Sequence, residues 1–396
     1  MEFKTLKKYS EALLAGSKLN LNVRMKEVRS DISAGMYSAI PILSPSDFPQ
    51  YDRSAVDGFA VRYEDVLSAG LNNPISLKLV GSIHVGDANN IRIGKNQCAE
   101  IFTGAEVPEG ADAVVMQEDA EIEGEYVAIF RKVKKFQNIG RKGEDLKTGD
   151  KIIDRGQRIM PWHIPAFIET GIEKVNVFDL KIGVLSTGDE IVSGKVKNAS
   201  APMLQSLIVR DGFNSVFLGN VEDNVEKISN VIRSFEGDLL IVTGGSGPSS
   251  TDLMDSILQN LGQIIFHGIR MKPGRTTGLA LVNDKPIFTI SGLPVAALIA
   301  YENVIRPLIF NWLSIKETRP NIVKGELTRS IFNNEAMKMF VRVRLSNKDG
   351  KIYVDPLRTT GSGIINSVIN ADGYLIIDEN VEGYQEGQLV EVKLIG

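Results

Sequence analysis

Between Lys181 and Leu313 short apolar runs alternate with longer amphipathic stretches, and this alternation restricts the fold more than any other feature of the chain. The runs KIGVLS, DLLIVTGG, QIIFHGI and PIFTISG are almost continuously apolar. Helical patterns begin near Val225 and Asp252, and a long apolar helix ends the region. Strands buried on both faces, with helices between them, are typical of a parallel sheet covered by helices. We therefore predict a central α/β domain with a parallel sheet.

Two β-rich regions flank this domain. From about Asp57 to Val133, short alternating strands are broken by Gly, Asn and Asp, which predicts a small β-domain. The tail, about 321–396, returns to alternating strands and predicts a second one. Residues 1–40 have a helical apolar pattern, and a short helix is predicted at about Pro161–Thr170, before Gly171.

Charge and residue inventory exclude several function classes. The chain has 396 residues, enough for roughly two to four domains, and a formal net charge of −4. It therefore lacks the basic excess of a general nucleic-acid binder. One cysteine, Cys98, cannot form an internal disulfide, and the three histidines lie too far apart in sequence to build a Cys/His metal cluster with it.

No stretch of the sequence suits a membrane span. The N-terminal segment MEFKTLKKYSEALLAG lacks the apolar core of a signal peptide. The most apolar helical stretch, Val295–Leu313, contains Glu302, Arg306 and Pro307, so a buried helix explains it better. We expect a cytoplasmic protein without membrane or nucleic-acid partners.

Three strand ends of the predicted sheet carry unusual loops. They are Ser186–Glu190 after KIGVL, Thr243–Gly247 after LLIV, and Ser291–Pro294 after PIFTI. Ligands of open parallel sheets bind beyond the carboxyl ends of the strands. Glycine-rich turns before helices let backbone N–H groups approach an anion. A single loop of this kind could merely make a tight turn; three at one edge favour an anionic, nucleotide-like ligand.

Charged residues accompany these loops. Lys272-Pro273-Gly274-Arg275 places two cations on a stiff turn, which suits a phosphate or oxyanion beside the loops, although such pairs are also common on solvated surfaces. Carboxylates near an anion could hold Mg²⁺ or accept hydrogen bonds from a ring, or could simply cap helices and make turns. The candidate carboxylates are Asp57, Asp145, Asp189, Glu190, Asp223 and Asp252.

Six motifs, in the same order along the chain, resemble the MoeA family of molybdopterin molybdenumtransferases and the related E domain of gephyrin. DRSAVDGFAVR (52–62) is similar to the family's DNSAMDGYAVR, and IFTGAEVPEGADAVV (101–115) to MTGAPVPEGADAVV. NIGRKGED (138–145), STGDE (186–190) and KPG (272–274) also match. The last motif comprises GSG (361–363), Ser367 and ADG (371–373).

The resemblance implies an elongated, multidomain α/β plus β subunit that forms a two-fold homodimer. Its central domain, 176–316, is a MogA-like α/β domain with a parallel sheet. Residues 1–45 and 140–175 would form an N-terminal mixed α/β domain, 46–139 a small inserted β-domain, and 317–396 a C-terminal β-barrel-like domain. Asp57, Thr103 and Asp145 would lie on the segments that face the other subunit.

The activity implied by the resemblance is a step of molybdenum cofactor biosynthesis. Adenylylated molybdopterin and molybdate are the substrates, Mg²⁺ or another divalent cation is the cofactor, molybdenum is inserted at the dithiolene, and AMP is released. Other cofactor-synthesis proteins or apo-molybdoenzymes are implied as partners. The expected catalytic residues are Asp57, Asp145, Asp252, Lys272 and Arg275. The expected ligand-binding residues are Thr103, Ser186, Thr187, Gly188, Gly244, Gly245 and Ser362, and the expected metal ligands are Glu190, Asp223 and Asp252.

Several family motifs are altered at the strand ends. Asn198-Ala199-Ser200 stands in place of D-[ST]-N, GGSGPSSTD (244–252) in place of GGVSxGxxD, Arg275-Thr276 in place of Lys-Pro, and a shortened GLPVA (292–296) in place of GLPGNPVS. Three hypotheses therefore stay open. The chain is a divergent molybdenum insertase, a MoeA-like paralogue that binds a molybdopterin or nucleotide ligand or a partner protein without catalysis, or another enzyme on the same scaffold.

Overall fold

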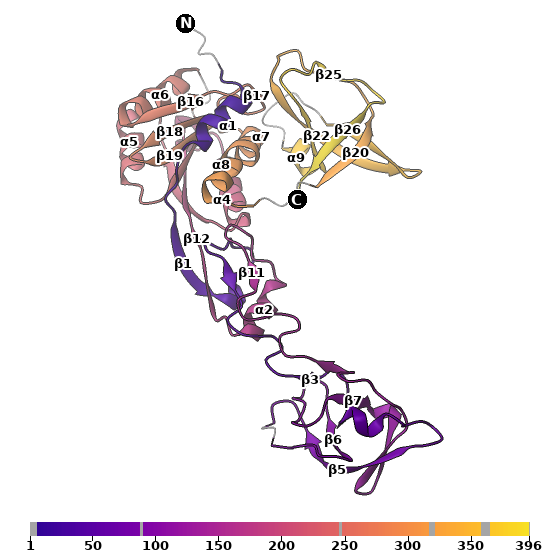
Figure 1. The fold of residues 1–396 in the computed structure, drawn as a ribbon. Helices are drawn as coiled ribbons and strands as arrows, with labels where there is room; N and C mark the ends of the chain where they lie inside the picture. The colour runs from indigo at the N-terminus through magenta and orange to yellow at the C-terminus, as the bar shows by residue number, and fades with distance from the viewer. Residues whose placement is uncertain (1–5, 88–89, 245–247, 317–320, 358–364, 396) are drawn as a thin grey trace.

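The computed structural model describes residues 6–87, 90–244, 248–316, 321–357 and 365–395. The molecule is elongated (Figure 1). The α/β sheet and the C-terminal strands lie at one end, and an inserted β-sheet lies at the other. A slender middle part joins them; it contains β1 (Arg24–Arg29), β11 (Lys151–Ile153), β12 (Lys174–Asp179) and α2 (His163–Thr170). The predicted fold class is confirmed, while the boundaries of the four domains stay predictions.

The central sheet has the strand order β14-β13-β15-β19-β18-β16. Its strands are β13 (Lys181–Thr187), β14 (Asn214–Val221), β15 (Leu239–Thr243), β16 (Gln263–His267), β18 (Gly278–Val282) and β19 (Lys285–Ile290). The first four in the sheet order, β14, β13, β15 and β19, pair in parallel. The accompanying helices are α3 (Asp189–Val192), α4 (Ser200–Arg210), α5 (Val225–Ser234) and α6 (Pro248–Leu261).

The sheet departs from the predicted parallel arrangement at one side. β18 pairs antiparallel with both β19 and β16. Asn283 and Asp284 connect β18 to β19 with positive φ values of 49° and 61°. Such a two-residue turn can join only antiparallel strands, and Asn and Asp tolerate this backbone conformation. Because β18 is reversed, β16 runs parallel to β19 and ends at the same sheet edge as β13, β15 and β19.

The apolar segment Val295–Leu313 is a buried helix, as expected. It consists of α7 (Pro294–Ala300), a π-helical turn (Tyr301–Ile305) and α8 (Arg306–Leu313). The hydroxyl of the buried Tyr301 donates a 2.9 Å hydrogen bond to Asp211, which also pairs with Arg306 at 3.2 Å. Within the described ranges, no helix combines the length and apolar character needed to cross a membrane.

The expectation of a helical N-terminus over residues 1–40 holds, within the described residues 6–40, only for α1 (Tyr9–Ser17). The chain then forms β1 (Arg24–Arg29), which pairs antiparallel with β12 (Lys174–Asp179), and a 3-10 turn (Ser30–Ile32). Pairing with a strand far along the chain overrides the local helical pattern. The short helix before Gly171 is confirmed as α2 (His163–Thr170), and β2 (Ile42–Leu43) pairs with β11 (Lys151–Ile153).

The inserted β-domain contains a six-stranded sheet in the order β7-β4-β6-β5-β9-β8. Its strands are β4 (Gly58–Val61), β5 (Ile75–Ile83), β6 (Gln97–Ile101), β7 (Ala113–Met116), β8 (Ala120–Glu123) and β9 (Tyr126–Ile129). Two 3-10 turns, Tyr63–Val66 and Gln117–Asp119, lie beside them. The strand pair β3 (Arg53–Ser54) and β10 (Ile139–Gly140) joins this sheet to the middle part.

The C-terminal strands form a closed barrel, because β22 pairs with both β23 and β24. The barrel strands are β20 (Ile322–Leu327), β22 (Lys338–Lys348), β23 (Lys351–Pro356), β24 (Gly373–Ile377) and β26 (Leu389–Leu394). The short pair β21 (Ile331–Phe332) and β25 (Gly383–Tyr384) and the turn α9 (Asn366–Ile369) accompany it. β17 (Met271–Lys272) leaves the α/β domain and pairs in parallel with β22, so Lys272 lies where the two domains meet.

Candidate active site

The carboxyl ends of β13 and β15 bring buried hydroxyl groups together. The side-chain oxygens of Ser186, on β13, and Thr243, on β15, lie 3.1 Å apart. Both residues are almost fully buried. Neighbouring parallel strands end at the same edge, so two loops that lie far apart in sequence converge, as predicted.

Asn198 and Ser200 connect the start of α4 to these strand ends through hydrogen bonds. The amide nitrogen of Asn198 donates to the Ser186 hydroxyl and to the Asn220 side chain, both at 2.8 Å. Its amide oxygen accepts from the backbone N–H of Ala201 at 3.1 Å. The Ser200 hydroxyl donates to the Gly292 carbonyl at 2.7 Å. The altered sequence Asn198-Ala199-Ser200 therefore still joins three strand ends to the first turn of α4.

Two glycines allow the loops to approach each other. Gly188 and Gly244 have φ values of +143° and +119°, which disfavour a side chain. A Cβ atom on Gly244 would lie 2.1 Å from the Thr187 carbonyl oxygen. The backbone N–H of Gly244 donates to the Ile290 carbonyl at 3.2 Å. The first and second loops thus pack directly on each other and on the end of β19.

Thr187 adds a buried hydroxyl that is unsatisfied. The residue is 1% exposed, and its hydroxyl has no hydrogen-bond partner within the described part of the chain. Leaving such a group unpaired costs about 1–3 kcal/mol. A ligand or water that bonds to Thr187 at this edge would recover that cost, which marks the position as a candidate contact.

Acidic side chains crowd the end of β14 and the start of α3. A side-chain oxygen of Asp189 accepts a 3.1 Å hydrogen bond from the backbone N–H of Asp223. Burial raises the pKa of the Asp223 carboxyl, and the negative charges of Asp189 and Glu190 raise it further. Glu190 and Asp223 are therefore near each other, as expected. Over the described residues, however, no three His, Cys, Asp or Glu side chains are arranged to hold a metal ion.

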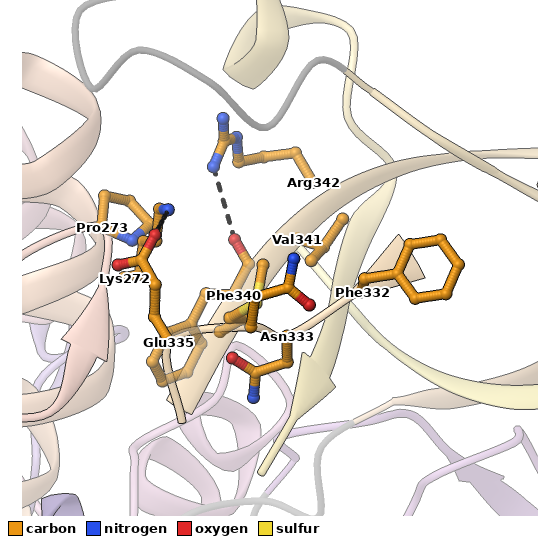
Figure 2. Close-up of a pocket in the computed structure, with 10 residues that line it drawn as sticks. Lys272, Pro273, Phe332, Asn333, Glu335, Phe340, Val341 and Arg342 are labelled. Atoms are coloured by element: carbon orange, nitrogen blue, oxygen red, sulfur yellow. Dashed lines mark hydrogen bonds and ion pairs between the residues drawn. The ribbon is translucent and has the colours of Figure 1, made fainter. Parts of the chain in front are cut away.

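Lys272 lies at a cavity between the α/β domain and the barrel. The cavity measures about 180 Å³, and its lining includes Lys272, Pro273, Phe332, Glu335 and Arg342 (Figure 2). The Lys272 ammonium forms an ion pair with the Glu335 carboxylate. Arg275, the second predicted cation, is exposed, and its carbonyl accepts from the backbone N–H of Ile269 at 2.9 Å.

Arg342 was not predicted as a site residue, although it lines the same cavity. The side chain is 2% exposed, and its Nε donates to the Ser367 hydroxyl at 3.2 Å. Burial lowers the pKa of this guanidinium. The strand sequence FVRVRL contains Arg342 and Arg344, and only the first is buried. The alternating pattern does not distinguish them, so only the packing of the barrel identifies Arg342.

The predicted residues of the inserted β-domain form a separate cluster. The Asp57 carboxylate accepts hydrogen bonds from the backbone N–H and the hydroxyl of Thr103, at 2.7 and 2.8 Å. These two bonds hold the pKa of Asp57 below its usual range. Asp145 is exposed in the turn after β10. Figure 1 places the inserted domain at the far end of the molecule from the α/β sheet, so one chain does not bring Asp57 and Thr103 to the strand-end loops.

Three further predicted positions cannot be placed in the site. Gly245 and Ser362 lie outside the described residues. Asp252 belongs to α6, but its side chain also lies outside the described part.

Comparisons with known proteins match nearly the whole chain. Residues 6–171 match the MoeA N-terminal region (domain I and II), residues 183–311 a probable molybdopterin binding domain, and residues 324–395 the MoeA C-terminal region (domain IV). A putative molybdopterin biosynthesis protein of Methanocaldococcus jannaschii is 36% identical, over 95% of this chain and 94% of that protein. The molybdopterin molybdenumtransferase of Bacillus subtilis is 30% identical, over 91% of this chain and 87% of that protein.

The fold is also similar to solved structures. The crystal structure of a molybdopterin biosynthesis MoeA protein from Pyrococcus horikoshii superimposes with a TM-score of 0.84 and 31% identity, over 98% of this chain and 99% of that chain. The fold and the strand-end site thus define a multidomain protein of molybdenum cofactor biosynthesis. Within that class, the chain belongs to the MoeA family.

Proposed function

We propose that this chain is a molybdopterin molybdenumtransferase, which inserts molybdenum from molybdate into adenylylated molybdopterin and releases AMP. The observation that carries the proposal is the convergence of Ser186, Thr187, Gly188 and Gly244 at the strand-end edge, where the buried Thr187 hydroxyl has no hydrogen-bond partner among the described residues. The relatives named molybdopterin molybdenumtransferase support it. The altered Asn198-Ala199-Ser200 sequence does not oppose it, because these residues still fasten α4 to the strand ends.

In this proposal the cations and the loops bind the anionic parts of the substrates. Lys272 and Arg275 would attract molybdate and phosphate oxygens, since lysine acts as a point charge and arginine binds bidentately. The loops after β13 and β15, with the Thr187 hydroxyl, would position the pterin and its phosphates, and we propose that Gly245 and Ser362 join them. Asp57, Asp145 and Asp252 would orient the reacting groups. Catalysis would then rest mainly on positioning and electrostatic stabilisation.

A divalent cation such as Mg²⁺ fits the acidic residues near the strand ends. Burial raises the pKa of Asp223, and the negative charges of Asp189 and Glu190 raise it further; a cation would relieve that repulsion. Mg²⁺ usually binds one or two carboxylates together with substrate phosphates and water. We propose Glu190, Asp223 and Asp252 as its protein ligands. The bound ion would neutralise charge on the phosphate oxygens.

We further propose a cytoplasmic homodimer. A second copy could bring Asp57 and Thr103 to the strand-end loops, which the single chain does not do, and we propose that Asp145 comes with them. The middle part supports this, because it exposes several large apolar side chains that a partner would cover. They are Met25, Ile32, Leu43, Trp162 and Ile168.

The test is incubation of the purified protein with adenylylated molybdopterin, molybdate and Mg²⁺, with AMP and active cofactor measured over time. We expect both products to form. Lys272→Ala should lower the rate of AMP release at least about tenfold, because a cation facing the developing charge is lost. Lys18→Ala, an exposed lysine after α1, is the matched control and should leave the rate unchanged. Tight ligand binding without AMP release would instead support a binding paralogue.

A further inference from the structure

Lys272, which we propose as an anion-binding residue, already forms an ion pair with a carboxylate of the same chain. Lys272 lies on β17, in the segment that leaves the α/β domain, whereas Glu335 precedes β22 of the barrel. Their side chains form an ion pair across the cavity between the two domains. Figure 2 shows the two charged groups together at the cavity wall.

The Glu335 carboxylate resembles an oxyanion ligand in its interaction with Lys272. It carries one negative charge on oxygen acceptors and reaches the ammonium from the barrel side of a cavity of about 180 Å³. A lysine ammonium is a compact point charge. While Glu335 neutralises it, an incoming anion meets a weaker attraction and a like charge beside it.

We propose that Glu335 is an internal competitor for the oxyanion that binds at Lys272. The inference rests on the proposed role of Lys272 and adds a residue that sets the affinity of that subsite. The incoming anion takes the place of the Glu335 carboxylate on the ammonium. Only anions that bind Lys272 better than this carboxylate does are retained.

The structure indicates that the displacement costs little. The Lys272 and Glu335 side chains are 42% and 49% exposed, and ion pairs this exposed are weak. The strand pairing of Met271 and Lys272 with Lys338 and Met339 joins the domains independently of the ion pair. Breaking the pair therefore frees the ammonium without separating the barrel from the α/β domain.

The experiment measures molybdate binding to the full-length protein by calorimetry, without molybdopterin, for wild type, Glu335→Gln, Lys272→Ala and the double variant. Glu335→Gln keeps the side-chain shape and removes the charge. We expect it to bind molybdate about two- to fivefold more tightly, with a smaller gain at high salt. In the Lys272→Ala background the same change should give no gain. Glu386→Gln, at an exposed acid of the barrel outside the cavity, should match wild type. Thermal unfolding verifies that each variant is folded.

The inference is overturned if Glu335→Gln binds molybdate no better than wild type, or if neither of these two proteins binds molybdate. It is also overturned if Glu335→Gln tightens molybdate binding equally in the Lys272→Ala background. The AMP-release assay separates this result from the fate of the proposed function. If the protein releases AMP but Glu335→Gln does not change molybdate binding, the transferase proposal stands and the competitor proposal fails. If Glu335→Gln tightens molybdate binding only when Lys272 is present, but the protein releases no AMP, the competitor proposal stands and the transferase proposal fails.

Discussion

At the residue scale, the site depends on particular side chains and glycines that tolerate few substitutions. Gly244 needs both a positive φ and the absence of a Cβ, because the Thr187 carbonyl lies against it. Asp57 needs both donors of Thr103 to keep its carboxylate oriented. Substitutions at these positions therefore separate backbone strain, steric contact and hydrogen bonding from one another.

Gly244→Ala should destabilise the protein and disturb the first two loops. The new Cβ would lie 2.1 Å from the Thr187 carbonyl oxygen at a φ of +119°, so we expect a loss of at least about 2 kcal/mol in the free energy of unfolding and slower AMP release. Equilibrium unfolding in urea measures the loss. Gly194→Ala is the control, since Gly194 has a φ of +72° with open space around it. Equal losses in the two variants would contradict the steric argument.

The Asp57–Thr103 contact predicts a pH dependence with a definite sign. Because hydrogen bonds lower the pKa of Asp57 in the folded protein, its contribution to stability is fully present above the unfolded value of about 4 and is lost as pH falls through the lowered value. Thr103→Val should raise the pKa of Asp57 towards its usual value, as carboxyl chemical shifts in an NMR titration would record. Thr103→Ser retains the hydroxyl and should keep the low pKa. Because valine keeps the backbone N–H bond, an unchanged titration in Thr103→Val would refute the share assigned to the hydroxyl.

At the element scale, the site is made by the attachment of α4 to a sheet edge. Asn198 bonds to the end of β13, to Asn220 on β14 and to the first turn of α4, and Ser200 bonds to the loop after β19. The reversal of β18 matters in the same way, because it lets β16 end at this edge, a few residues before Lys272 in the chain. Orientation of the elements, more than the identity of one motif, therefore positions the candidate residues.

Asn198→Ala should lower stability and activity together. It removes two donated hydrogen bonds and one accepted bond, for which we expect a loss of about 1–3 kcal/mol in the free energy of unfolding. AMP release should also slow, since Ser186 loses a partner. Asn224→Ala is the control: it removes only the cap of α5, a 3.0 Å bond from Lys227 N–H, and should cost about 1 kcal/mol without affecting AMP release. Identical activities in the two variants would argue against a positioning role for Asn198.

At the scale of the whole molecule, the elongated shape separates two groups of candidate residues. The strand-end loops and Lys272 lie at one end, and the Asp57–Thr103 pair lies at the other. The buried core of the α/β domain extends into α1 and to Phe340 and Tyr374 of the barrel, so these parts pack together. The inserted domain has its own core clusters. A site that uses both groups must be completed by a second copy.

Trp162→Glu should weaken the proposed dimer. Trp162 is 68% exposed in the middle part, and a charge there would be buried without a partner in an apolar interface. We expect the dissociation constant, measured by analytical ultracentrifugation, to rise at least about tenfold. Leu71→Glu, at an 84% exposed leucine of the inserted domain, is the control and should leave it unchanged. A wild-type protein that is monomeric at micromolar concentration would remove the dimer proposal.

Features that depend on local pattern could be read from the amino-acid sequence. Apolar runs identified the strands β13, β15 and β19, because a strand buried on both faces must be apolar throughout. Glycine and serine after these runs identified the strand-end turns, and six ordered motifs identified the family. Asp57 was named as a candidate carboxylate and Thr103 from the family motifs, and the structure brings the two together.

Contacts between distant segments became known from the three-dimensional fold. It paired β1 with β12, reversed β18, buried Arg342 rather than Arg344, and joined Lys272 to Glu335. Local preferences are worth tenths of a kcal/mol to about one kcal/mol per residue, and packing against remote elements overrides them. The strand-end loops could thus be recognised from the sequence. The ion pair between Lys272 and Glu335 depends instead on how the barrel packs against the α/β domain.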